Sequence, residues 1–139
     1  MSLLQLDNLI KTGKLKAEPY NEKEYSDLVH SGQGRLQDSL KSDLSLESRF
    51  LLAYNAAHSF SLAALRWHGY RSTNRYVVFL ALEHTLGVSS EIWRVLDLCH
   101  NRRNVAEYEG HLEVDEQLLR ELVTATQLLF DRVSKNSRE

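Results

Sequence analysis

The sequence S-S-E-I-W-R-V-L-D-L-C-H-N-R-R-N-V-A-E-Y-E-G, residues 89–110, has the spacing of a long helix with one apolar face. At 100° per residue, four side chains fall within an arc of about 60°, namely Ile92, Leu96, Cys99 and Arg103. Three of them favour burial, whereas the guanidinium of Arg103 stays charged and needs an anion or a carbonyl as its partner. Either a carboxylate of the fold holds Arg103, or this side chain binds the phosphate of a ligand.

A polar wedge begins on the same apolar face. It contains His100, Arg103, Asn104 and Glu107, at positions i, i+3, i+4 and i+7. A histidine moves protons near neutral pH, an arginine binds phosphate through two hydrogen bonds, and an asparagine orients either group. The alternative is that Arg103 pairs with Glu107 one turn further on, and that the wedge is only a solvated edge.

The rest of the chain also favours helices, because it contains one proline and only six glycines. We expect helices over residues 3–12, 22–41, 46–69, 75–86, 90–110 and 116 to about 133, and no strand. The predicted N-caps are Asn21, Ser45, Ser89 or Ser90, and Asp115. Gly32 and Gly34 interrupt the second helix and indicate a kink or a close helix contact there. The predicted fold is an all-α, up-and-down bundle of four to five main helices plus a short N-terminal helix.

Size and composition are those of one ordinary globular domain spanning residues 1–139, with 42% hydrophobic and 26% charged residues. No apolar stretch approaches the roughly 18–20 residues of a membrane span, so no membrane partner is expected. The start of the chain lacks a basic flank and soon becomes polar, unlike a secretion signal. Cys99, the only cysteine, has no partner for an internal disulfide. Together these features predict a cytoplasmic protein.

Charge is unevenly distributed along the chain. Lysine and arginine number 17 against 19 acidic residues, and this net charge of −2 argues against broad electrostatic capture of nucleic acid. Residues 66–103, however, contain six arginines against three acidic residues. A local anion site is therefore compatible with the overall acidity.

A second candidate site is the segment Arg66-Trp67-His68-Gly69-Tyr70-Arg71, followed by Arg75 and Tyr76. Basic residues interleaved with aromatic ones bind single-stranded RNA through phosphate contacts and stacking. The alternative is a helix end, since arginine and histidine complement the helix dipole and Gly69 suits a C-cap.

The histidines do not predict a metal centre. They are His30, His58, His68, His84, His100 and His111. No two are three or four residues apart, which is the spacing that directs two rings of one helix at one ion. No serine lies in a nucleophile-elbow pattern. We expect neither a metal nor a cofactor.

Two stretches carry a resemblance to a known family. R-N-V-A-E-Y, residues 103–108, resembles the R-N-x-x-x-H signature on the penultimate or last long helix of HEPN domains. R-F-L-L-A-Y-N-A-A, residues 49–57, is similar to a helix of one bacterial subgroup of that family. The resemblance extends from about Glu24 to Val133 and implies an all-α bundle that usually dimerises.

The resemblance also implies functions. Active HEPN domains are metal-independent ribonucleases, many of them in toxin–antitoxin or other defence systems, and others bind nucleotides or pair with a small nucleotidyltransferase that modifies them. In the family, arginine and histidine from two subunits surround the scissile phosphate. Arg103 and Asn104 match the signature, but Tyr108 stands in place of the histidine. A phenol with a pKa near 10 is a poor base at neutral pH, and His100 is the other candidate base.

We therefore expect a homodimer whose two Arg103 side chains meet in a groove that binds RNA or a nucleotide. Its expected ligand-binding residues are Arg102, Arg103, Asn104, Glu107 and Tyr108. One alternative is a metal-independent endoribonuclease whose catalytic residues are Arg103, Tyr108 and His100. The other is a non-catalytic protein-interaction module that uses this helix as its contact face.

Overall fold

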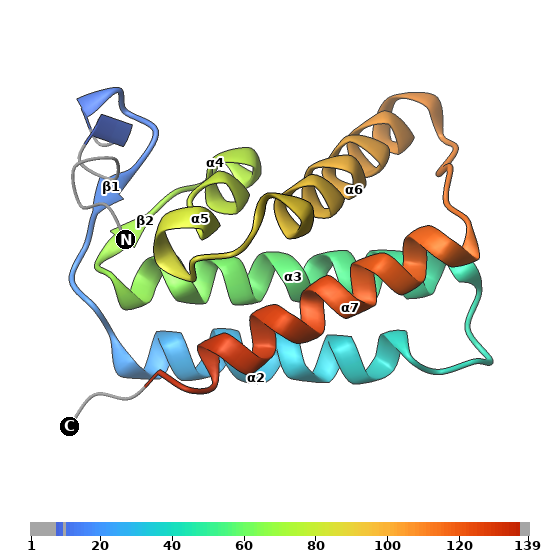
Figure 1. The fold of residues 1–139 in the computed structure, drawn as a ribbon, viewed down its shortest axis with the longest axis horizontal. Coiled ribbons are helices and arrows are strands. Elements are labelled where there is room, and N and C mark those ends of the chain that lie inside the picture. The colour runs from blue at the N-terminus through green and yellow to red at the C-terminus, as the bar shows by residue number, and fades with distance from the viewer. Residues whose placement is uncertain (1–7, 10, 137–139) are drawn as a thin grey trace.

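The computed structural model describes residues 8, 9 and 11–136 and is an all-α bundle, as the sequence predicts (Figure 1). Its four long helices are α2 (Glu22–Ser39), α3 (Leu46–Trp67), α6 (Ser90–Glu109) and α7 (Glu116–Val133). Successive long helices run in opposite directions, so the topology is up-and-down. Two short helices, α4 (Arg75–Leu80) and α5 (Leu82–Thr85), connect α3 to α6. None of the described helices combines the length and the apolar character that crossing a bilayer requires.

Local capping chemistry sets the helix boundaries. The side chains of Asn21, Ser45, Ser89 and Asp115 each accept a hydrogen bond from a backbone N–H three residues further on, as predicted. Gly110 ends α6 in the left-handed conformation, with φ of 71°. Helix α2 ends at Ser39, slightly earlier than its sequence pattern indicated.

Helix α3 is the centre of the molecule, and α2, α7, α4 and α6 pack around it (Figure 1). Its side chains Phe50, Tyr54 and Phe60 are fully buried. Helix α2 approaches α3 so closely at Gly32 that an added Cβ would lie 2.5 Å from a ring carbon of Phe60. Of the two alternatives that the glycines indicated, a kink or a close helix contact, the close contact is present at Gly32, whereas Gly34 faces open space.

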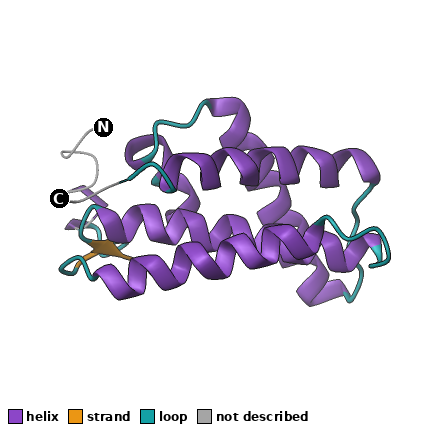
Figure 2. Cartoon of the chain, turned by 90° about the horizontal axis from the view of Figure 1, so that it is seen from below, coloured by secondary structure: helices purple, strands orange, loops and turns teal. Residues whose placement is uncertain are grey.

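Three sequence-based expectations differ from the structure or lie outside the described residues. The chain does contain strands: β1 (Lys16–Ala17) pairs antiparallel with β2 (Tyr70–Arg71), at one end of the bundle (Figure 2). Two residues are too few for an alternating pattern, which explains why the sequence predicted none. The expected helix over 75–86 is divided at Ala81 into α4 and α5. The expected helix over 3–12 lies mostly outside the described residues, of which 8, 9 and 11 are helical.

Candidate functional site

Arg103 lies on α6 where this helix faces α3. Its Nη2 is 2.8 Å from Oε1 of Glu107, and the two side chains are 25% and 55% exposed. Its Cζ also lies 5.8 Å from the ring centroid of Tyr54 on α3. A half-exposed pair four residues apart on one helix contributes only about 0.3–0.5 kcal/mol. Glu107 is therefore a weak partner, and the phosphate of a ligand would compete with it.

Arg75, the first residue of α4, is a second cation at the same ring. Its Cζ lies 5.7 Å from the ring centroid of Tyr54, which is fully buried. The Nη1 atom of Arg75 is buried and has no hydrogen-bond partner among the described residues, and Arg75 forms no ion pair with any of them. An unsatisfied buried donor costs about 1–3 kcal/mol, more when it is charged. This donor is therefore suited to an acceptor supplied from outside the chain.

His100 is committed to hydrogen bonds inside the fold. Its Nδ1 is 2.9 Å from the hydroxyl of Tyr54, and its Nε2 is 3.1 Å from the amide nitrogen of Asn104. Burial lowers the pKa of His100, and the positive charge of Arg103 acts in the same direction, against the opposing carboxylate of Asp97. Because Nδ2 of Asn104 can only donate, Nε2 of His100 accepts this bond and Nδ1–H donates to the hydroxyl of Tyr54. The basic nitrogen of His100 is thus engaged, so the ring orients Tyr54 and Asn104 and is poorly placed to accept a proton from a ligand.

The pKa of His58, on α3, reflects the positive electrostatic potential of the site. Its pKa is lowered to about 4, first by burial and then by the positive charges of Arg75 and Arg103. The pKa of Tyr54 is raised by burial, although Arg75 favours the phenolate. With the histidine and the tyrosine neutral, the charges at the site are the guanidiniums of Arg75 and Arg103 and the carboxylate of Glu107. Their sum is positive, so the site attracts an anion.

The structure brings four of the predicted site residues together and separates the other two. His100, Arg103, Asn104 and Glu107 share the side of α6 described above. Tyr108 is 89% exposed and, five residues after Arg103, points about 140° away around the helix.

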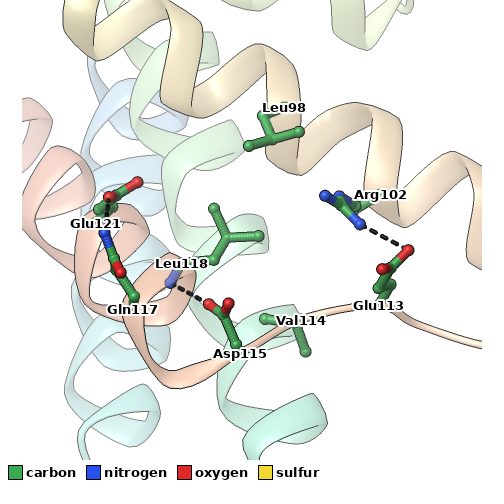
Figure 3. Close-up of a pocket in the computed structure, with 8 residues that line it drawn as sticks. All are labelled: Leu98, Arg102, Glu113, Val114, Asp115, Gln117, Leu118 and Glu121. Atoms are coloured by element: carbon green, nitrogen blue, oxygen red, sulfur yellow. Dashed lines mark hydrogen bonds and ion pairs between the residues drawn. The ribbon is translucent and has the colours of Figure 1, made fainter.

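Arg102 also points away from Arg103, towards α7. Its Nη1 is 2.8 Å from Oε2 of Glu113, at a cavity of about 450 Å³ beside the start of α7 (Figure 3). Leu98 and Leu118 line the same cavity. Within one chain, Arg102 is therefore not part of the Arg103 site.

The second candidate, the basic and aromatic segment from Arg66 onward, is only partly available to a ligand. Arg66 is 1% exposed, pairs with Glu24, and donates to the carbonyls of Glu18 and Pro19 at 2.9 and 2.6 Å. Arg71 binds the carboxylates of the same two glutamates. The interpretation of these two arginines as RNA contacts is wrong, because Glu18 and Glu24 already neutralise them.

Sequence reasoning missed Tyr54 and His58, and it assigned Arg75 to the second candidate segment rather than to this site. Tyr54 and His58 follow the spacing of the core face of α3, and Arg75 follows a loop. Only the convergence of α3, α4 and α6 brings them together, so no spacing within one segment identifies them. No group of three potential metal ligands occurs among the residues that the structure describes. Comparison with family models, curated proteins and solved structures finds no match to this chain.

Proposed function

We propose that this chain is a HEPN-like domain that binds RNA or a nucleotide through its phosphate, in the basic site between α3, α4 and α6. One observation carries the proposal: Arg75 and Arg103 converge on the ring of Tyr54, and Nη1 of Arg75 is buried without an acceptor. A phosphate oxygen is a strong acceptor for guanidinium donors, and it would displace the weak pairing of Arg103 with Glu107.

The proposal includes a homodimer, with Arg103 near its axis. A cavity of about 340 Å³ adjoins Arg103 and is lined also by Leu51 and Glu107. Leu51 and Ala106 are the apolar side chains that line it, and Leu51 is 37% exposed. A second copy packed against these apolar side chains would cover the mouth of the cavity.

The site supports binding better than cleavage. His100 has both ring nitrogens engaged in hydrogen bonds, and Tyr108 points away from Arg103 within the same chain. The alternative of a protein-interaction module rests on the Arg103–Glu107 pair, which gives the guanidinium a partner within its own helix. That alternative leaves the buried donor of Arg75 without an explanation.

The test is equilibrium binding of a labelled single-stranded oligoribonucleotide, with a chelator present so that metal-independent cleavage is measured in the same samples. Arg75→Gln and Arg103→Gln should each weaken binding by roughly 10- to 150-fold, since a charge-assisted hydrogen bond contributes about 1.5–3 kcal/mol. The matched control is Arg94→Gln, because Arg94 is exposed and lies about 180° from Arg103 on the same helix.

Three outcomes are informative. If Arg94→Gln weakens RNA binding as much as the other two variants, the loss reflects net charge alone, and this would contradict a specific phosphate site. Absence of binding by the unmodified protein, to both RNA and nucleotides, would leave the interaction module as the better account. Chelator-resistant cleavage lost in Arg103→Gln would favour the ribonuclease.

A further inference from the structure

Tyr76 is an exposed aromatic ring held at the edge of the phosphate site. It follows Arg75 directly in α4 and is 43% exposed. Its ring packs edge-on against Trp93 of α6, with ring centroids 6.4 Å apart and planes at 73°. It also lies 6.5 Å from the ring of His100, which is itself bonded to Tyr54. The rings of Tyr76, His100 and Tyr54 therefore form a continuous series that reaches the guanidinium of Arg75.

A second unsatisfied donor lies in the same helix contact. The indole Nε1 of Trp93 is buried and has no hydrogen-bond partner among the described residues. In the part of the chain that the structure describes, the other buried side-chain atoms without a partner are Thr85 Oγ1 and Nη1 of Arg75. Two of these three atoms therefore belong to side chains of the α4–α6 contact. Since such donors are costly when unpaired, two of them beside one exposed ring indicate a ligand that carries several acceptors and a flat apolar face.

We propose that Tyr76, supported by Trp93, is the platform on which the ligand stacks an unpaired nucleobase, so that the site takes single-stranded rather than duplex RNA. The inference rests on the phosphate-binding function proposed above and adds the residue that recognises the base. A nucleotide has both required parts, because its phosphate oxygens and ribose hydroxyls are acceptors and its base is a flat ring. In a duplex the base is already stacked on its neighbours and is inaccessible to a side chain.

Exposure alone does not identify the platform. Tyr108 is more exposed, at 89%, but no other ring contacts it among the described residues. The ring of Tyr76 is held by two neighbouring rings, so stacking a base on it loses little conformational entropy. Stacking of this kind tolerates any base, because every base has a π face.

The experiment compares three RNA probes of equal length: a single strand, the same strand with an abasic site at each central position, and a duplex. The single strand should bind most tightly. Tyr76→Leu should weaken binding of the intact single strand by roughly 5- to 150-fold and leave binding of the abasic strand unchanged. Tyr76→Phe keeps the ring and should retain the affinity, and thermal melts of both variants verify folding.

The outcomes separate this inference from the proposed function. If Arg75→Gln weakens binding of the intact and abasic strands while Tyr76→Leu weakens neither, the phosphate site stands and the base platform is overturned. Equally tight binding of the duplex, or an equal loss on both single strands in Tyr76→Leu, would overturn the platform in the same way. If Arg75→Gln changes nothing, the proposed function itself is contradicted.

Discussion

Replacing Arg75 by methionine should make the protein more stable and, at the same time, weaken the proposed binding of RNA. The aliphatic part of the side chain is kept, whereas the buried and unpaired Nη1 atom disappears. Function and stability are then opposed at one residue. This is expected where a side chain is arranged for a ligand that is absent from the free protein.

The magnitude follows from two opposing terms. Removing an unsatisfied buried donor stabilises the folded state by about 1–3 kcal/mol. The guanidinium lies 5.7 Å from the ring centroid of Tyr54, and loss of this cation–π contact costs about 0.5–2 kcal/mol. The expected balance is a gain of about 1 kcal/mol in the free energy of unfolding, or about 3–4 °C in melting temperature for a chain of this size. Binding of RNA should weaken by roughly 10- to 150-fold.

Urea unfolding at equilibrium measures the stability, and fluorescence anisotropy of a labelled single strand measures the binding. Arg94→Met is the matched control, because Arg94 is exposed on the far side of α6 and should change neither quantity much. A loss of more than 1 kcal/mol in Arg75→Met with unchanged RNA affinity would show that Arg75 is a structural cation. The reasoning about its unpaired donor would then be refuted.

Three further predictions concern the fold that supports the site. Gly32→Ala should destabilise the protein by about 1–3 kcal/mol, because the added methyl group has no room against α3. Gly34→Ala should instead stabilise it by up to about 1 kcal/mol, because Gly34 faces open space. Chemical unfolding of both variants measures the difference in their free energies of unfolding. The pKa of His58 is about 4 in the folded state and about 6.5 when unfolded, so His58 stabilises the fold fully only above pH 6.5, where it is neutral in both states. As the pH falls from 7 to 5, the unfolded state takes up a proton and the free energy of unfolding falls by about 2 kcal/mol. His58→Gln should remove that part of the pH dependence, as measured by urea unfolding at the two pH values. Glu24→Gln should cost about 1–3 kcal/mol in a thermal melt, because it leaves the buried guanidinium of Arg66 with half of its carboxylate partners.

Controls for these predictions are available in the chain. Exposed His111 provides the comparison for the pH experiment, since His111→Gln should leave the difference between pH 7 and pH 5 as it is in the parent protein. A parent pH dependence that persists in His58→Gln would contradict the assignment to His58. For the ion pairs, a Glu24→Gln protein as stable as the parent would show that Glu18 alone is sufficient for Arg66. Equal effects at the two glycines would contradict the close contact at Gly32.

Features encoded within one segment could be predicted from the sequence. Asn21, Ser45, Ser89 and Asp115 each bond a backbone N–H three residues away, so the local sequence was sufficient to place the helix starts. The apolar spacing of α3 likewise predicted its burial, and Gly32 indicated the close approach of a neighbouring helix.

Features that depend on contacts between distant segments could not be predicted. The partners of Arg66 are Glu18 and Glu24, more than 40 residues earlier, so its burial as an ion pair left no local pattern. Arg75 was noticed as one basic residue among several, but its relation to Tyr54 depends on how α4 packs on α3. Arg103 makes both kinds of contact in the structure: the local ion pair with Glu107 and the distant contact with Tyr54.

The most direct test of the account is a crystal structure of the protein with a short single-stranded oligoribonucleotide. We expect one phosphate oxygen within about 2.7–3.2 Å of Nη1 of Arg75, with the guanidinium of Arg103 beside the same phosphate. RNA bound elsewhere on the molecule, or a carboxylate of a second copy on Nη1 of Arg75, would contradict the claim that α3, α4 and α6 form a phosphate site.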